Sequence, residues 1–219
     1  MPALAFLHTS PAHVAPFTAL VARLAPAMAA HHAVDESLLA QARAEGPTAS
    51  VRAALARALD ETAATARARL VVCTCSTLGP LAETLEDRPY AIQRIDRAMA
   101  RLAVATGKRV AMLAALPSTL APTRALLEDA AAREGHDVSI SEHLAATAWP
   151  HFEAGDTPAY LAALREAISA IRPQADVVVL AQASMAAAAH DWPPGAPVLA
   201  SPELGVKAAL EALGVQVSA

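Results

Sequence analysis

One short segment of the chain has residue types that suit acid–base chemistry. Residues 69–80 read RLVVCTCSTLGP, in which an apolar, β-branched run passes into Cys75, Ser76 and Thr77. In an open parallel sheet, reactive groups lie just beyond the carboxyl ends of the strands. A cysteine after a strand can also be a packing residue. A helix starting after Cys75 would lower the pKa of its thiol, and this position favours a functional role for Cys75.

Polar residues also follow three other predicted strands. These segments are His8-Thr9-Ser10, Ser118-Thr119 and Gln182-Ala183-Ser184. Hydroxyl groups and main-chain amides in such turns can donate hydrogen bonds. His8 is the titratable member of this set, and it is a second candidate acid or base because a histidine changes charge near neutral pH.

Strands and helices alternate along the chain, which is typical of an α/β fold with parallel sheets. Apolar periodicity and turn residues predict strands at 3–7, 33–34, 70–74, 90–92, 109–115, 138–141, 177–181 and 197–200. They predict helices at 17–24, about 48–70, 78–85, 95–105, 120–133, 157–173 and 201–214. Pro122 is expected in the first turn of its helix, and Trp149 in a loop.

The pattern is duplicated. Thr9 and Cys75 are 66 residues apart, and Ser118 and Gln182 are 64 residues apart, with a strand and an amphipathic helix inside each interval. This spacing predicts two similar lobes related by pseudo-twofold symmetry, each a short parallel sheet flanked by helices, with the site in the cleft between them. We expect lobe one at residues 1–98, completed by 200–219, and lobe two at 99–199.

Several other polar residues have an ordinary structural interpretation. Adjacent residues in a strand point to opposite faces, so His31 and His32 are not a metal-binding pair. Arg94 and Asp96 are interpreted as an exposed ion pair of little energetic value. Cys73 is expected in the core, and it is too close in sequence to Cys75 for an ordinary structural disulfide.

Composition excludes several classes of function. The formal net charge is −4, so no basic surface is expected for nucleic acid or for an anionic membrane. The chain lacks a long apolar run and a basic leader segment, and its two cysteines suit a reducing, cytoplasmic setting. No glycine-rich phosphate loop or metal-ligand spacing is present, so neither a cofactor nor a metal is expected.

These motifs resemble those of the aspartate/glutamate/hydantoin racemase superfamily, and the resemblance covers nearly the whole chain. In that family a Cys-Asn-Thr-like motif ends a strand of lobe one, and a Gly-Cys-Thr or Gly-Cys-Ala-Gly-Met-like motif ends its counterpart in lobe two. The two cysteines flank the substrate carbon; one removes a proton and the other returns one. Cys75-Ser76-Thr77 is similar to the first motif. The resemblance also implies that dimers are common.

The second motif departs from the family pattern. Residues 180–185 read LAQASM, which places Gln182 at the cysteine position. A glutamine amide has no usable pKa near neutral pH, so racemisation by two thiols cannot run in its usual form. The resemblance implies that the substrate-binding residues are Thr9, Ser10, Ser76, Thr77, Ser118, Thr119, Gln182, Ala183 and Ser184.

The resemblance implies a cofactor-independent racemase or isomerase that acts on a carbon next to a carboxylate or carbonyl of a small carboxylate-bearing molecule. Its substrate would be an amino acid, a hydantoin or a related acid. Cys75 would be the acid or base, with His8 the nearest candidate for a second one. The alternatives are a one-cysteine decarboxylase of a substituted malonate, since related decarboxylases use one cysteine, and a non-catalytic protein that binds small acids.

Overall fold

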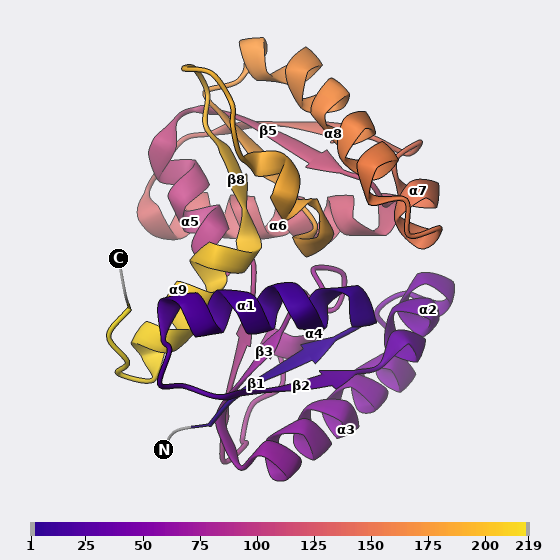
Figure 1. Cartoon of the computed structure of the whole chain (residues 1–219), viewed down its shortest axis with the longest axis vertical. Coiled ribbons are helices and arrows are strands. Elements are labelled where there is room, and N and C mark those ends of the chain that lie inside the picture. The colour runs from indigo at the N-terminus through magenta and orange to yellow at the C-terminus, as the bar shows by residue number, and fades with distance from the viewer. Residues whose placement is uncertain (1–2, 218–219) are drawn as a thin grey trace. The chain divides into compact units, whose positions relative to one another are not determined.

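The structure is a computed structural model that describes residues 3–217, and it divides into two compact units (Figure 1). The first unit contains the described residues up to Ile95 together with those from Pro202 onward, and the second contains Asp96–Ser201. Each unit is built around one sheet. No helix among the described residues is long and apolar enough to cross a membrane.

Each sheet has four parallel strands. The strands of the first unit are β1 (Ala3–His8), β2 (Ala30–Val34), β3 (Ala68–Cys73) and β4 (Ala91–Arg94). The strands of the second unit are β5 (Arg109–Ala114), β6 (Ser139–Leu144), β7 (Val177–Leu180) and β8 (Val198–Ala200). The orders are β2-β1-β3-β4 and β6-β5-β7-β8, so the two units repeat one topology. The predicted α/β class with two similar lobes is confirmed.

Helices cover the sheets of both units. The first unit has η1 (Pro11–His13), α1 (Val14–Leu24), α2 (Glu36–Glu45), α3 (Ala49–Ala66), α4 (Gly79–Glu83) and α9, which begins at the last residue of the second unit (Ser201–Ala212). The second has α5 (Arg97–Thr106), α6 (Pro117–Glu134), α7 (Trp149–Glu153), α8 (Thr157–Ile171), η2 (Arg172–Gln174) and η3 (Ala183–Ala189).

Strand alternation places successive residues of β1 on opposite faces of the first sheet. Ala5 and Leu7 pack in a buried cluster with residues of α2 and α3. Phe6 points to the other face and contacts Phe17 of α1, with ring centroids 5.2 Å apart. Figure 1 shows α1 and α3 on opposite sides of these strands. His8 therefore shares the α1 face with Phe6.

The carboxyl-terminal helix packs on the first unit. α9 lies beside α1, and the guanidinium of Arg23 is 2.7 Å from the carboxylate of Glu203 (Figure 1). Gln93 of β4 donates its side-chain amide to the Gly205 carbonyl at 3.0 Å. A Cβ atom on Gly205 would lie 2.1 Å from the Ile95 carbonyl oxygen, so only a glycine allows α9 to approach β4 this closely.

In the second unit, one face of the sheet packs on α8. Leu113 of β5 and Leu180 of β7 share a buried cluster with Tyr160, Leu164 and Ile168 of that helix. α5 and α6 contact β7 and β5. The central strands β5 and β7 are therefore buried on both faces, as the continuous apolar run Val177–Leu180 predicts.

Several predicted boundaries differ from the structure. α3 ends at Ala66 rather than near Leu70, because Arg67 adopts a left-handed conformation with φ 51°. β3 begins directly after Arg67, at Ala68, two residues before its predicted start. β2 is longer than predicted and contains both His31 and His32. The predicted loop around Trp149 is the short helix α7.

Helix α6 begins three residues earlier than predicted. Pro117 occupies its first position, where a missing N–H costs nothing, so Ser118 and Thr119 lie in the first helical turn. Pro122 then falls inside the helix rather than in the first turn. Gly135 ends the helix with φ 70°, as its position in the sequence predicts.

Candidate active site

Main-chain hydrogen bonds place Cys75 and Gln182 at equivalent positions of their own units. The N–H of Thr74 donates to the penultimate carbonyl of β1 at 3.1 Å. The N–H of Ala181 donates to the penultimate carbonyl of β5 at 2.9 Å. The next residue, Cys75 or Gln182, therefore stands at the same point beyond the third strand of its unit. One unit presents a thiol there and the other presents an amide.

Cys75 begins a tight turn at the carboxyl end of β3. Its side chain is 8% exposed and packs in the cluster on the α3 side of the sheet. Its carbonyl accepts hydrogen bonds from the N–H groups of Leu78 at 3.2 Å and Gly79 at 2.9 Å. Cys73 lies in the core, and both residues are thiols rather than a disulfide. The helix predicted at residues 78–85 begins at Gly79 and is five residues long.

Hydroxyl-bearing residues of two adjacent strand ends meet at this edge of the first sheet. Leu7 pairs with Cys73, so Thr9 and Cys75 each lie two residues beyond paired positions. Thr9 is buried, while Ser10 is partly buried and its hydroxyl accepts a hydrogen bond from the Ala12 amide at 3.4 Å. Ser76 and Thr77 follow Cys75 directly and are buried and partly buried. The structure thus brings these predicted residues of lobe one together.

Gln182 is anchored to its own unit. Its Oε1 accepts hydrogen bonds from the main-chain N–H groups of Ala115 at 2.6 Å and Leu116 at 3.1 Å, between β5 and α6. These amides precede the amino terminus of an 18-residue helix, where partial positive charge favours an oxygen atom. The side-chain carbonyl of Gln182 therefore occupies two main-chain donors that precede the predicted substrate-binding residues Ser118 and Thr119.

The other predicted residues of the second unit lie in the first turns of α6 and η3. Thr119 is buried, and the Ser118 hydroxyl is buried with no hydrogen-bond partner within residues 3–217. Ala183 is buried at the start of η3. The Ser184 hydroxyl lies 2.9 Å from the hydroxyl of Tyr160, whose pKa is raised to about 12 by burial. Tyr160 was not predicted, because only folding brings α8 beneath this turn.

His8 is buried at the end of β1 rather than open to solvent. Its Nδ1 lies 2.9 Å from the Thr74 hydroxyl and its Nε2 lies 2.9 Å from Nδ1 of His32. Burial lowers the pKa of His8 to about 3, with smaller contributions from the charges of His13 and His32. The imidazole is therefore neutral at pH 7, and both of its nitrogens are already engaged.

The interpretation of Arg94 and Asp96 as an exposed pair is wrong. Their exposed fractions are 3% and 0%, because β4 pairs with β3 and places Arg94 next to Cys73. The Arg94 guanidinium packs on Gly79, where an added Cβ atom would lie 2.8 Å from Nε. Its Nη1 is 3.5 Å from the carboxylate of Glu83. A buried cation therefore supports the turn that carries Cys75.

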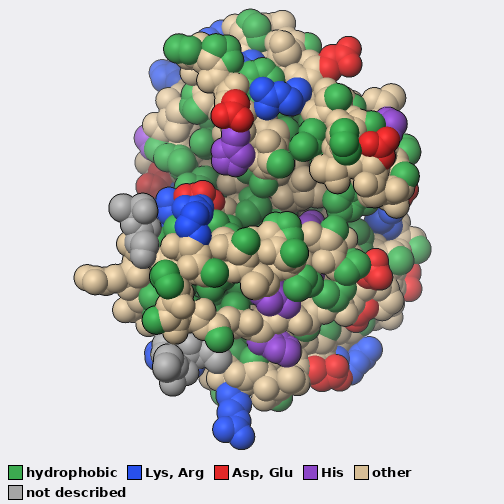
Figure 2. Space-filling model, in the orientation of Figure 1, with side chains coloured by type: hydrophobic (Ala, Val, Ile, Leu, Met, Phe, Trp, Pro, Cys, Tyr) green, Lys and Arg blue, Asp and Glu red, His purple; other side chains and the backbone are tan. Residues whose placement is uncertain are grey.

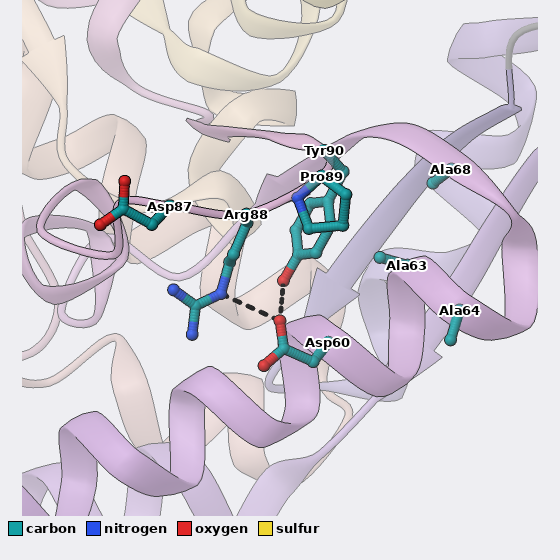
Figure 3. Close-up of a pocket in the computed structure, with 8 residues that line it drawn as sticks. All are labelled: Asp60, Ala63, Ala64, Ala68, Asp87, Arg88, Pro89 and Tyr90. Carbon is teal, nitrogen blue, oxygen red and sulfur yellow. Dashed lines mark hydrogen bonds and ion pairs between the residues drawn. The ribbon is translucent and has the colours of Figure 1, made fainter.

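A distinct cavity lies away from Cys75. Figure 3 shows this pocket of about 610 Å³, where Asp60 accepts hydrogen bonds from Arg88 at 2.9 Å and from Tyr90 at 2.5 Å. The hydrogen bond from Tyr90 is the main cause of the lowered pKa of Asp60. Ala68 and Tyr90 stand at the amino ends of β3 and β4, the opposite edge of the sheet from Cys75. No predicted site residue lines this pocket.

The described residues contain no group of three or more His, Cys, Asp and Glu side chains arranged to hold a metal ion. On the face displayed in Figure 2, charged side chains are dispersed among apolar and neutral groups rather than gathered in a patch of one sign.

Comparison with known proteins identifies a family over most of the chain. The sequence profile described as Asp/Glu/Hydantoin racemase matches residues 10–209. No curated protein sequence matches the chain significantly.

Solved structures share the whole fold at low sequence identity. The Picrophilus torridus aspartate racemase is 12% identical with a TM-score of 0.77, covering 100% of this chain and 96% of its own. The allantoin racemase of Pseudomonas fluorescens is 19% identical with a TM-score of 0.64, covering 99% and 93%. A cysteine-for-glycine mutant of arylmalonate decarboxylase is 18% identical with a TM-score of 0.62, covering 99% and 96%.

Proposed function

The chain belongs to the Asp/Glu/hydantoin racemase family, and from this premise we propose that it catalyses cofactor-independent proton transfer at a carbon next to a carboxylate or carbonyl group. Cys75 is the proposed acid–base group, and the substrate is an amino acid, a hydantoin or a related small acid. The observation that carries this proposal is the position of Cys75, which begins a tight turn beyond β3, beside Thr9 and Ser76.

The proposed reaction starts with removal of a proton from the substrate carbon by the Cys75 thiolate. The electron pair of the broken C–H bond moves to the adjacent carbonyl or carboxylate oxygen, which gains enolate character. Donors that are fixed before the reaction stabilise such charge most effectively. The main-chain amides and hydroxyls of Thr9-Ser10 and Ser76-Thr77 are proposed for this role. The thiol then returns a proton to the carbon, and the thiolate is restored.

Racemisation needs a second acid that delivers a proton to the other face of the carbon. Gln182 has no usable pKa, and its Oε1 is held by two main-chain amides. His8 is the second acid expected from the sequence, but it is neutral at pH 7 and bonded through both ring nitrogens. The racemase form of the proposal therefore requires proton delivery by a group other than Gln182.

A one-thiol decarboxylation is the second candidate, and the anchored Gln182 side chain favours it. Loss of CO₂ from a substituted malonate leaves the bond's electron pair on the carbon as an enolate, and a single proton from Cys75 completes the product. Both racemases and an arylmalonate decarboxylase mutant share this fold, which supports either reaction as a proposal.

Turnover of a defined panel tests the proposal. The protein is incubated with single enantiomers of amino acids and hydantoins and with disubstituted malonates, while optical rotation and CO₂ release are followed. Cys75→Ser is compared with the matched control Cys73→Ser, because Cys73 is a core thiol two residues away. We expect turnover of one substrate class that is lost in Cys75→Ser and kept in Cys73→Ser.

Two results would overturn the proposal. Turnover that survives in Cys75→Ser would show that another group carries the proton. Ligands that raise the melting temperature of the wild-type protein without turnover would favour a non-catalytic protein that binds small acids.

A further inference from the structure

A chain of four polar side chains crosses the first unit from the surface to the end of β3. Thr18 of α1 is exposed, His32 of β2 is partly buried, and His8 and Thr74 are buried. The Thr18 hydroxyl is 3.1 Å from Nε2 of His32, and both ring nitrogens of His8 continue the chain inward at 2.9 Å. Nothing in the proposed reaction uses these contacts.

Aromatic packing holds both imidazoles in a fixed orientation. The ring planes of His8 and His32 are nearly parallel, at 10°, with centroids 5.2 Å apart, an arrangement that suits the hydrogen bond between their nitrogens. Phe6 stacks on His32 at 5.2 Å, and Phe17 contacts His8 at 5.3 Å. These contacts leave the ring nitrogens little freedom to choose other partners.

The direction of each hydrogen bond follows from the inner end. The Thr74 hydroxyl donates its single proton to the Leu7 carbonyl at 3.1 Å, so it must accept a proton from Nδ1 of His8. Nε2 of His8 therefore carries a lone pair and accepts from Nδ1–H of His32. Each ring is thus assigned a proton on Nδ1.

The outer end has two arrangements that keep every inner hydrogen bond. When His32 is neutral, its Nε2 accepts the proton of the Thr18 hydroxyl at 3.1 Å. When His32 is protonated, Nε2 donates to Thr18, whose own proton turns to the Val14 carbonyl 2.8 Å away. Protonation of His8 instead would place an N–H group against Nδ1–H of His32.

We propose that Thr18, His32, His8 and Thr74 form a directional hydrogen-bond relay that takes up a proton at His32 and holds the end of β3, with Cys75, in place. His8 is a positioning residue in this relay, because the Thr74 proton ends on a main-chain carbonyl and the relay delivers no proton to Cys75. The part that concerns Cys75 rests on the function proposed above.

The charges of neighbouring histidines oppose protonation of the two imidazoles in the relay. The charge of His13, whose ring centroid is 6.0 Å from that of His8, disfavours protonation of His8. The charge of His31 disfavours protonation of His32, and burial lowers the pKa of His32 more than this charge does. His32 therefore takes up its proton below the ordinary histidine pKa of 6.5.

Nitrogen-15 NMR of histidine side chains tests the relay without reference to any activity. We expect the Nδ1–H tautomer for His8 at pH 7, and a scalar coupling across the hydrogen bond between Nε2 of His8 and Nδ1 of His32. An Nε2–H tautomer of His8, or no coupling between the two rings, would overturn the assignment.

Alkylation of Cys75, located by mass spectrometry and measured as a function of pH, tests the positioning role. His32→Phe retains an aromatic ring next to Phe6 but removes both nitrogens, and His31→Phe is the matched control on the opposite face of β2. His32→Phe loses the hydrogen bonds to His8 and to Thr18, and loss of the bond to His8 is expected to change the alkylation rate by about three- to tenfold. Loss of the titrating ring is expected to remove an inflection below pH 6.5. His31→Phe is expected to retain both.

If the alkylation rate of Cys75 depends on pH in the same way in His32→Phe, His31→Phe and the wild type, the positioning role is overturned. Thr18→Ser should behave as the wild type, whereas Thr18→Val removes the acceptor for the charged His32 ring and should shift the inflection to lower pH. If the NMR and alkylation results hold while no substrate of the panel turns over, the proposed function fails and the relay stands.

Discussion

Acidification should destabilise the protein through His8. We consider a change from pH 7 to pH 5, a range that spans the ordinary histidine pKa of 6.5 and stays above the folded-state pKa of His8, which burial lowers to about 3. In this range the unfolded chain binds a proton at His8 that the folded protein does not bind. Stability therefore increases with pH where the unfolded state holds more protons, and it is lost as the pH falls below 6.5.

The magnitude follows from the distance between pH 5 and the unfolded-state pKa. That distance is about 1.5 pH units, which corresponds to about 2 kcal/mol lost from the free energy of unfolding. His13 has a pKa lowered to about 4 by burial and acts in the same direction. The carboxylates with lowered pKa values are Asp60, Asp129, Asp176 and Glu203, and their ordinary values of 3.8 and 4.5 place them below this window.

Urea unfolding at several pH values between 7 and 5 measures this loss. His8→Asn removes the titrating ring. The number of protons taken up on unfolding, which sets the slope of the free energy of unfolding against pH, should therefore fall by about one in this range. His31→Asn is the control, because residues 31 and 32 point to opposite faces of β2. A free energy of unfolding that is constant from pH 7 to pH 5 would contradict this effect of His8, and so would an unchanged dependence of that free energy on pH in His8→Asn.

Three further changes test local parts of the fold by urea unfolding at pH 7. Gly205→Ala places a Cβ atom 2.1 Å from the Ile95 carbonyl oxygen, and a loss of about 3 kcal/mol or more is expected because main chain must move; a change below about 0.5 kcal/mol would contradict the close approach. Thr48→Ala removes the hydroxyl that accepts from the Val51 amide at 3.3 Å, with a loss of about 1 kcal/mol expected, while Thr48→Ser should retain most of the stability. Gln182→Leu leaves the amides of Ala115 and Leu116 without their acceptor, with a loss of about 1–3 kcal/mol expected; equal stability would show that the anchor contributes nothing.

The sequence predicted the arrangement of strands and helices better than it predicted side-chain environments. Alternating segments and equal spacing of the polar turns depend on local patterns, and both units have the strand order that such a duplication requires. The predicted helix boundaries that are wrong by a few residues, such as the start of α6 at Pro117, lie where proline and small residues allow more than one helix start.

The environment of Gln182 could not be predicted because its partners are 66 and 67 residues away in the chain. Burial of Arg94 depends on the pairing of β4 with β3 and on the packing of Gly79 against its guanidinium. His8 was recognised as a strand-end residue, but strand alternation alone does not show that His32 and Thr74 engage both nitrogens. These features require the tertiary fold.

The proposed function depends above all on Cys75 transferring protons to and from a carbon acid. Proton NMR in deuterated water, with a single enantiomer of the substrate identified in the panel, tests it most directly. We predict loss of the α-proton signal with retained configuration, or a single deuterium at the carbon left by decarboxylation, and absence of both in Cys75→Ala. Exchange that continues at the wild-type rate in Cys75→Ala would contradict the claim, and fully racemised product would contradict the one-thiol reaction and require a second acid other than Gln182.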